Sequence, residues 1–281
     1  MKFYEFVQSP LEDKLSQILK EAEDTLFIAT PFIKDYGIKV ILDNATVGNL
    51  RILTNLDLTN IASLGFDIES LLKLWSKFDV HISSLGKLHA KTYIADNKIA
   101  FLTSANLTRG GLRENYEYGI ILRDREIVSI MISDMNKYFG LGNIFDRKTI
   151  EDIKNDIKEI RELRQKIEKS IELKNLNRFL KQKEDNLKTK FLRNRIKGKT
   201  INSIFAETIR YLLETKGPLS TEELHPFIQN IHPDICDDSI DRVIDGQHFG
   251  KKWKHLVRNA QQYLKRKGII HLEGEKWSLE N

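Results

Sequence analysis

The chain has 281 residues, a formal net charge of +5 at pH 7 and a single cysteine, Cys236. This length allows one large or two ordinary globular domains, and the modest positive charge favours a polyanionic partner only weakly. The lone cysteine excludes an intrachain disulfide and a cysteine-based zinc site, and it fits a reducing cytosol.

The first residues, MKFYEFVQSPLEDKLSQ, lack the uninterrupted apolar segment of a signal peptide. No stretch of the chain approaches the length of an apolar membrane span. We therefore expect a soluble cytoplasmic protein with no membrane partner.

Helix and strand patterns alternate through residues 1–142. Helical spacing of apolar residues predicts helices over Leu11–Glu23, Ile38–Leu42, Ile61–Phe78 and Glu126–Tyr138. Apolar or alternating runs predict strands over Thr25–Ile33, Leu50–Thr54, Val80–Ser83, Thr92–Asn97, Ile99–Thr103 and Gly119–Leu122. This order predicts an α/β fold, in which helices cover both faces of a mixed sheet as an α/β/α sandwich.

Residues 143–198 have a different amino-acid composition, with no glycine or proline before Gly198. Arg147 to Lys199 contains eighteen Lys or Arg residues and nine Asp or Glu residues. One or two long helices are expected here, with a narrow apolar seam made by Ile153, Ile157, Ile160, Leu163, Ile167 and Ile171. Two interpretations stay open: a solvated connector, or a basic helical linker that lies along a nucleic acid or a partner subunit.

Residues 199–281 are expected to form a separate compact domain. Helices are predicted over Ile201–Leu213, Thr221–Ile228 and Lys251–Lys267, with Ser220 capping the second. Two short apolar runs, Ile269–Leu272 and Trp277–Leu279, flank a turn and predict a terminal hairpin. Three helices closed by a hairpin are the layout of a winged helix, whose third helix usually enters the major groove of DNA.

Within the first domain, residues 88–118 hold a cluster of reactive and polar residues. Their sequence is LHAKTYIADNKIAFLTSANLTRGGLRENYEY. His89 and Lys91 are two residues apart, so in an extended strand they point to the same face. A turn at Asn97-Lys98 is expected to bring Ser104 and Asn106 back beside them.

This stretch resembles the signature of the phospholipase D superfamily, H-x-K, four residues, D, six residues and G-S-x-N. His89, Lys91, Asp96, Ser104 and Asn106 match it, whereas Thr103 replaces its glycine. Asn115 and Glu117 lie where the nuclease branch of that family carries its downstream asparagine and glutamate. The resemblance covers about the first 140 residues.

The resemblance implies hydrolysis of a phosphodiester through a phosphohistidine on His89. Lys91, Asn106 and Ser104 would hold the non-bridging oxygens, and Glu117 would bond the far ring nitrogen of the histidine. Asp96 is grouped with these catalytic residues, although in the family its role is often to orient its neighbours, and a purely structural role is the favoured alternative. No metal and no other cofactor is required by this scheme.

The same scheme needs two histidines, one to attack phosphorus and one to protonate the departing oxygen. None of the other six histidines is followed two residues later by lysine, so the chain carries one copy of the signature. We expect a homodimer through the N-terminal domain, in which two signatures form one composite site.

The last domain more loosely resembles helix-turn-helix domains attached to restriction and modification-dependent nucleases. Its third helix offers candidates for phosphate contacts, Lys251, Lys252, Lys254, Arg258 and Lys265, and for base contacts, Asn259, Gln261 and Gln262. The alternative is that this basic face serves only solubility.

Together these patterns predict a sequence-directed DNA endonuclease of the restriction or phage-defence kind, acting on double-stranded DNA. A restriction role would imply a cognate DNA methyltransferase as a partner. Two alternatives stay open: a phospholipase or phosphatidyltransferase that acts on lipids, and an inactive DNA-binding regulator.

Overall fold

A computed structural model describes residues 3–56, 67–169 and 173–280 of the chain. Contacts between Cα atoms divide the protein into two compact units, Met1–Lys190 and Phe191–Asn281. Each unit has a hydrophobic core of its own.

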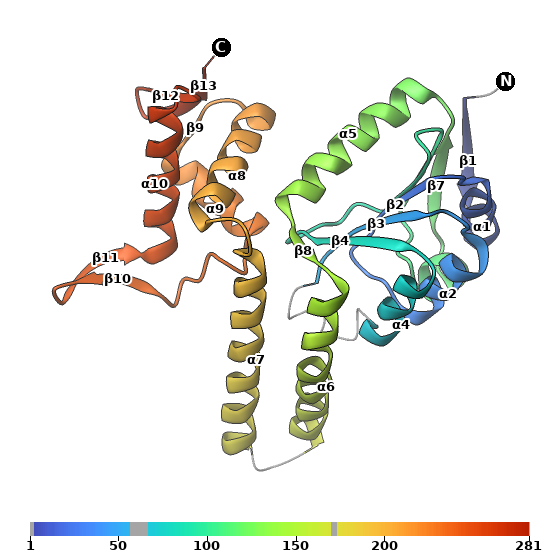
Figure 1. Cartoon of the computed structure of the whole chain (residues 1–281), viewed down its shortest axis with the longest axis horizontal. Helices are drawn as coiled ribbons and strands as arrows, with labels where there is room; N and C mark the ends of the chain where they lie inside the picture. The colour runs from blue at the N-terminus through green and yellow to red at the C-terminus, as the bar shows by residue number, and fades with distance from the viewer. Residues whose placement is uncertain (1–2, 57–66, 170–172, 281) are drawn as a thin grey trace. The chain divides into compact units, whose positions relative to one another are not determined.

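One eight-stranded mixed sheet forms the centre of the first unit (Figure 1). Its strands are β1 (Tyr4–Gln8), β2 (Thr25–Ala29), β3 (Asn49–Thr54), β4 (Asp79–Ser84), β5 (Thr92–Ala95), β6 (Ile99–Thr103), β7 (Tyr118–Leu122) and β8 (Asn143–Phe145). They lie in the order β1-β7-β6-β5-β2-β3-β4-β8, with β2, β3 and β4 parallel and the other neighbours antiparallel.

Helices cover both faces of this sheet, which confirms the predicted α/β/α sandwich (Figure 1). On one face lie α1 (Glu12–Glu21), α2 (Asp35–Asn44), α4 (Ile68–Leu72) and the short 3₁₀ segment η1 (Lys73–Ser76), and on the other lies α5 (Arg125–Leu141). The spacing of Leu15, Ile18 and Leu19, all buried, explains why α1 turns this side toward the core.

Several element boundaries differ from the sequence prediction. The strand expected over Thr25–Ile33 ends at Ala29, and Ile33 instead forms an isolated bridge with Leu107. Of the helix expected over Ile61–Phe78, residues 61–66 lie outside the described part of the chain, and the remainder is split between α4 and η1. The edge strands β1 and β8 carry no clean alternation of apolar and polar residues and were not predicted.

Two long helices follow the sheet, α6 (Arg147–Lys169) and α7 (Leu173–Arg195). The predicted seam residues Ile153, Ile157 and Ile160 are buried, and α6 packs against α4. Cross-helix ion pairs of 2.8 Å between Arg164 and Glu184 and of 2.5 Å between Lys183 and Glu159 join the two helices. Ile171 of the predicted seam lies outside the described residues.

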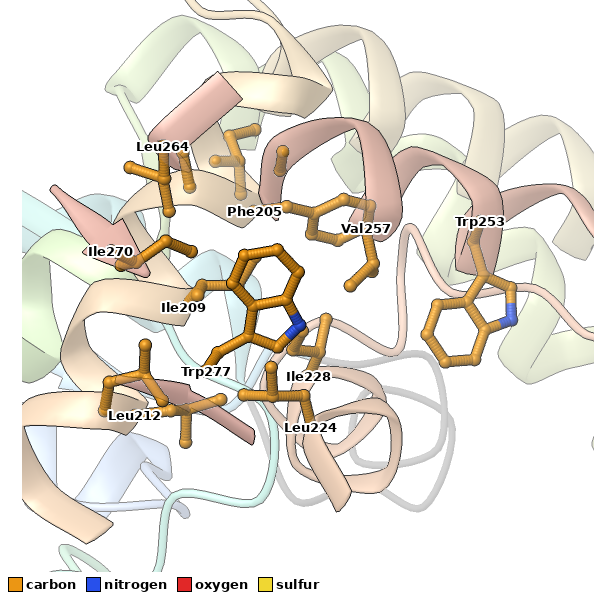
Figure 2. Packing of buried hydrophobic residues seen from close by; sticks show 14 of the residues in the cluster. Phe205, Ile209, Leu212, Leu224, Ile228, Trp253, Val257, Leu264, Ile270 and Trp277 are labelled. Carbon is orange, nitrogen blue, oxygen red and sulfur yellow. The ribbon is translucent and has the colours of Figure 1, made fainter. Parts of the chain in front are cut away.

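The second unit contains three helices, α8 (Ile201–Lys216), α9 (Thr221–Ile231) and α10 (Lys252–Arg266). A small sheet, ordered β12-β13-β9, is made by β9 (Leu219–Ser220), β12 (Ile270–Glu273) and β13 (Lys276–Leu279). Figure 2 shows the indole of Trp277 in the middle of the core and that of Trp253 at its edge. Trp277 Nε1 donates to Thr221 Oγ1 at 3.1 Å, so the core tryptophan also fixes the start of α9.

A further hairpin, β10 (Asp241–Ile244) with β11 (Gln247–Lys251), precedes α10 and was not predicted. Its turn uses Asp245 and Gly246, whose φ angles are 49° and 78°. The Asp-Gly pair was the available sequence signal, because it favours the left-handed backbone of a two-residue hairpin turn.

Replacing Trp277 with alanine should lower the free energy of unfolding of the second unit by about 3–5 kcal/mol, because a large side chain is lost from a packed core. Denaturant unfolding of the full chain followed by circular dichroism measures this change. The matched control is Tyr263→Ala on α10, whose side chain is 40% exposed and which should cost less than about 1 kcal/mol. Equal losses for both variants would contradict the assignment of Trp277 to the core.

Candidate active site

The His89–Lys91 segment lies directly before β5, at one end of the sheet. Strands β2, β3, β4 and β6 end there, and β5 and β7 begin there. The segment is irregular and not part of a strand, yet it holds the two side chains together. Lys91 Nζ donates to the His89 carbonyl oxygen at 2.9 Å and lies 3.1 Å and 3.3 Å from the ring nitrogens Nδ1 and Nε2.

The two side chains differ in their exposure to solvent. His89 is exposed, whereas Lys91 is only 7% exposed. Burial lowers the pKa of the Lys91 ammonium, and the negative charge of Glu117 opposes that shift. An accessible imidazole therefore stands beside a largely desolvated cation, which interacts strongly with an anion that enters the site.

Glu117 is held by a set of hydrogen bonds at the start of β7. Its two carboxylate oxygens accept from Ser104 Oγ, in a short bond, and from Asn115 Nδ2 at 3.2 Å. Its backbone N–H donates to Ser9 Oγ at 2.6 Å, and Ser9 N–H donates to its carbonyl at 3.0 Å. The structure thus joins Ser104, Asn115 and Glu117. These bonds engage both carboxylate oxygens, and within the described residues the His89 ring lies against Lys91 Nζ and not against the expected carboxylate.

Asn106 lies on the loop after β6, and two glycines hold this loop in place. A Cβ atom on Gly37 would lie 2.3 Å from the Leu107 carbonyl oxygen, and one on Gly111 would lie 2.5 Å from that of Asn106. Only residues without a side chain allow these approaches. Asn106 Oδ1 is also 3.4 Å from Thr30 Oγ1. Sequence reasoning missed Gly37 and Gly111, although the Gly110-Gly111 pair signals a close backbone contact.

Thr103 stands where the phospholipase D signature has glycine. It is paired with Gly119 across β6 and β7, and a Cβ on Gly119 would lie 3.0 Å from the Thr103 Cβ. Thr103 Oγ1 donates to the Tyr118 carbonyl at 3.1 Å and accepts from Ala105 N–H at 3.2 Å. Gly119 allows the close approach of Phe101 and Leu102 as well as Thr103, and the Thr103 hydroxyl helps to fix the turn before Ser104.

Asp96 lies at the opposite end of β5 from Lys91, and its grouping with the catalytic residues was wrong. Five residues of extended chain separate the two positions by about 16 Å. Its carboxylate accepts three backbone N–H groups, from Glu23 at 2.6 Å, Asp24 at 2.9 Å and Thr25 at 2.8 Å. Asp96 therefore fixes the start of β2 and does not face the other candidates.

The predicted DNA-contact residues lie on or beside α10 in the second unit. Those with exposed side chains are Lys252, Arg258, Asn259, Gln262 and Lys265. Lys251 pairs with Asp241 at 2.8 Å, and Lys254 Nζ lies 5.6 Å from the centre of the Trp253 ring.

Gln261 is not available to read a base, because it is 1% exposed and bonds to Thr221 Oγ1 at 3.1 Å. This prediction was wrong because the apolar stripe of α10 includes a polar position that faces the core. Asn259 and Gln262 instead line a surface cavity of about 610 Å³ together with Asn202, Leu256 and Arg266.

Residues 15–139 match the family described as cardiolipin synthase, PLD-like domain. No curated protein sequence matches the chain.

Solved structures with a similar fold include NucT from Helicobacter pylori, at 18% identity, covering 48% of this chain and 94% of that one with a TM-score of 0.37. The phospholipase D family member Nuc from Salmonella typhimurium, at 13% identity, covers 50% of this chain and 97% of that one with a TM-score of 0.41. Phosphatidylserine synthase from Haemophilus influenzae, at 14% identity, covers 57% and 43% with a TM-score of 0.42.

Replacing Asp96 with asparagine should destabilise the first unit by about 1–3 kcal/mol at neutral pH, because the three backbone donors lose a charged acceptor. Burial opposes ionisation of Asp96, but the three N–H groups lower its pKa below the ordinary 3.8. A depressed pKa gives stability that is present above pH 3.8 and is lost as the pH falls through the lower folded value. Thermal unfolding of both proteins across this range should show their difference shrinking in acid. A difference independent of pH would contradict this role.

Proposed function

Residues 15–139 belong to the phospholipase D superfamily, and on that premise we propose that the protein is a metal-independent DNA endonuclease that acts as a homodimer. One observation carries the proposal: the exposed His89 imidazole and the nearly buried Lys91 ammonium lie within 3.3 Å of each other. A phosphodiester is an anion that repels nucleophiles, so a buried cation beside an accessible nucleophile meets both needs of its hydrolysis.

The reaction proceeds in two displacements. A ring nitrogen of His89 attacks phosphorus and forms a P–N bond while the P–O bond to the departing sugar oxygen breaks. That oxygen takes a proton from a second imidazolium. Water then attacks phosphorus, the P–N bond breaks, and the second imidazole takes the proton of the water, which restores both groups.

The remaining side chains of the site hold the phosphate. Lys91 neutralises a non-bridging oxygen, and Asn106 donates to another. Ser104, which follows β6 and already donates to Glu117, lies where its hydroxyl would also help to hold these oxygens. Glu117 acts on the site through this bond and through its charge near Lys91.

We propose that the second imidazole of this reaction comes from another copy of the chain. His81 is the other histidine of the described first unit, and it lies within β4 with its Nε2 3.3 Å from Asp79. The five further histidines belong to the second unit. A symmetric dimer that joins two copies of His89 would supply both roles.

An exposed apolar face beside Glu117 supports this assembly. Tyr4, Phe6 and Tyr118 are 52%, 60% and 58% exposed. Their rings touch along β1 and β7, with centroids 5.5 Å and 6.1 Å apart. Leu102 of β6 adds to the face, and Tyr116 beside Glu117 is fully exposed. Monomeric proteins rarely expose a contiguous apolar area of this kind, and this one leads directly to the site.

Recognition of the DNA target would come from the second unit. Its three helices and small sheet fit a winged-helix-like DNA-binding domain, and the exposed basic residues of α10 suit contacts with phosphates of double-stranded DNA. This supports a restriction or phage-defence role, with a cognate DNA methyltransferase as the partner that protects host DNA. No helix among the described residues is long and apolar enough to cross a membrane.

Purified protein should cut plasmid DNA in excess EDTA, because the proposed chemistry uses imidazoles and a lysine and no metal ion. His89→Ala should reduce cutting by more than about 1,000-fold, since the nucleophile is lost. The matched control is His81→Ala, which removes the other histidine of the described first unit and should leave cutting intact.

Three other outcomes would reject this function. Hydrolysis of phosphatidylcholine without cutting of DNA would identify a lipid-acting enzyme. Binding of DNA with no phosphodiester cleavage by the unaltered protein would identify a regulator. Loss of cutting in EDTA that returns with a divalent cation would reject the metal-independent mechanism.

Phe6→Glu should convert the dimer to monomers and abolish cutting, because a charge would be buried in the apolar interface. Light scattering during size-exclusion chromatography measures the mass. Ile144→Glu is the matched control, since Ile144 is 50% exposed on β8 at the opposite edge of the same sheet. An unaltered protein that cuts DNA as a monomer would overturn the composite site.

A further inference from the structure

A cationic groove lies next to the site in the first unit. It is a cavity of about 670 Å³ between α6 and the starts of α2 and α4. Five basic residues line it: Lys34, Arg109, Lys154, Lys158 and Arg161. Its volume is in the range of pockets that hold small ligands or part of a larger one.

The segment at Ile33 and Lys34, which borders the groove, contacts the loop that carries Asn106. Lys34 N–H donates to the Leu107 carbonyl at 3.1 Å, and Ile33 and Leu107 form a β-bridge. Arg109 follows Asn106 by three residues. A chain whose scissile phosphate lies at Asn106 would therefore continue along this border of the groove.

Four acidic residues also line the groove, and three of them are bonded to neighbouring residues. Asp35 accepts from Ser70 Oγ at 2.5 Å and from Lys73 Nζ at 3.2 Å. Asp67 accepts from Ser70 N–H at 3.0 Å and so caps α4. Glu69 pairs with Lys154 at 3.2 Å. These bonds shape the walls and neutralise part of the acidic charge, while Glu162 remains exposed on α6.

Two of the five basic residues are available to an outside anion, whereas Lys154 pairs with Glu69 and Arg109 pairs with Glu114 at 2.8 Å. Lys34 and Lys158 are exposed, and within the described ranges neither forms an ion pair with a carboxylate. Arg161 is half-buried in the groove, where burial lowers the pKa of its guanidinium and the charge of Asp67 opposes this shift. A partly desolvated guanidinium is well suited to bidentate contact with a phosphate.

The spacing along α6 fits a repeating anion. Lys154, Lys158 and Arg161 follow one another by four and three residues, which places them on one face of the helix. They span about 10 Å along its axis, which corresponds to about three nucleotides of rise along one DNA strand. A phospholipid headgroup has no such repeat.

We propose that this groove binds the phosphates of the DNA strand that flank the scissile phosphodiester. The proposal rests on the function proposed above. Helix α6 begins after residue 139, where the match to the family ends, so it adds a substrate contact that the matched domain does not contain. This assigns a nucleic-acid role to part of the basic helical linker.

The test compares Lys158→Gln/Arg161→Gln with Lys148→Gln, which removes an exposed charge from the same helix outside the groove. Each protein is given duplex DNA and bis(4-nitrophenyl) phosphate, a diester with no flanking phosphate. The ratio of DNA cleavage to small-diester cleavage should fall about tenfold or more in the double variant at 0.1 M salt, and should not change in the control. An equal fall on both substrates, or no fall on either, would overturn the proposal.

A binding measurement separates failure of the groove from failure of the proposed function. In the His89→Ala background, the slope of log K against log salt concentration should decrease in magnitude by about 2 when both groove cations are removed, because two phosphate contacts are lost. An unchanged slope rejects the groove even if the enzyme cuts DNA. A changed slope supports it even if the unaltered protein cuts no substrate.

Discussion

The burial of the Lys91 ammonium is the constraint around which the site is arranged. A desolvated cation is costly unless nearby groups compensate for the water it has lost. Here the His89 carbonyl accepts from it and the charge of Glu117 lies nearby, while Ser104 and Asn115 hold that carboxylate. The compensation is partial, because burial still lowers the pKa of the amine. A bound phosphate would complete it, so the site is prepared for an anion before one arrives.

Sequence reasoning predicted that these residues lie near one another because the gaps between them fit two paired strands. His89 and Lys91 precede β5, Ser104 and Asn106 follow β6, and the antiparallel pairing of these strands brings them together. Spacing in the sequence was misleading for Asp96, because Asp96 follows β5 whereas Lys91 precedes it, so the two residues lie at opposite ends of that strand. Sequence reasoning also failed for Gln261, since an amide at a core position of α10 looks like a base reader until its buried partner is known.

The features that could not be predicted from the sequence were mostly contacts between residues far apart in the chain. The sandwich followed from alternating helix and strand patterns, whereas the edge strand β1 has its aromatic residues on an exposed face and so gave no core pattern. Gly37 and Gly111 approach the Asn106 loop from different parts of the chain, which no local pattern encodes. The role of the linker stayed open for the same reason. Its positive charge could be read from the sequence, but the packing of α6 on α4, which forms the groove, could not.

The bonds between Ser9 and Glu117 have a practical consequence for handling the protein. Ser9 accepts from the Glu117 N–H and donates to its carbonyl. The segment that follows the first strand therefore fixes the backbone position of a residue more than one hundred positions away. A variant that lacks the first strand or Ser9 would lose these bonds, and they would no longer fix the Glu117 carboxylate, whose charge lies near Lys91. Truncated forms of the chain should therefore keep β1 and Ser9.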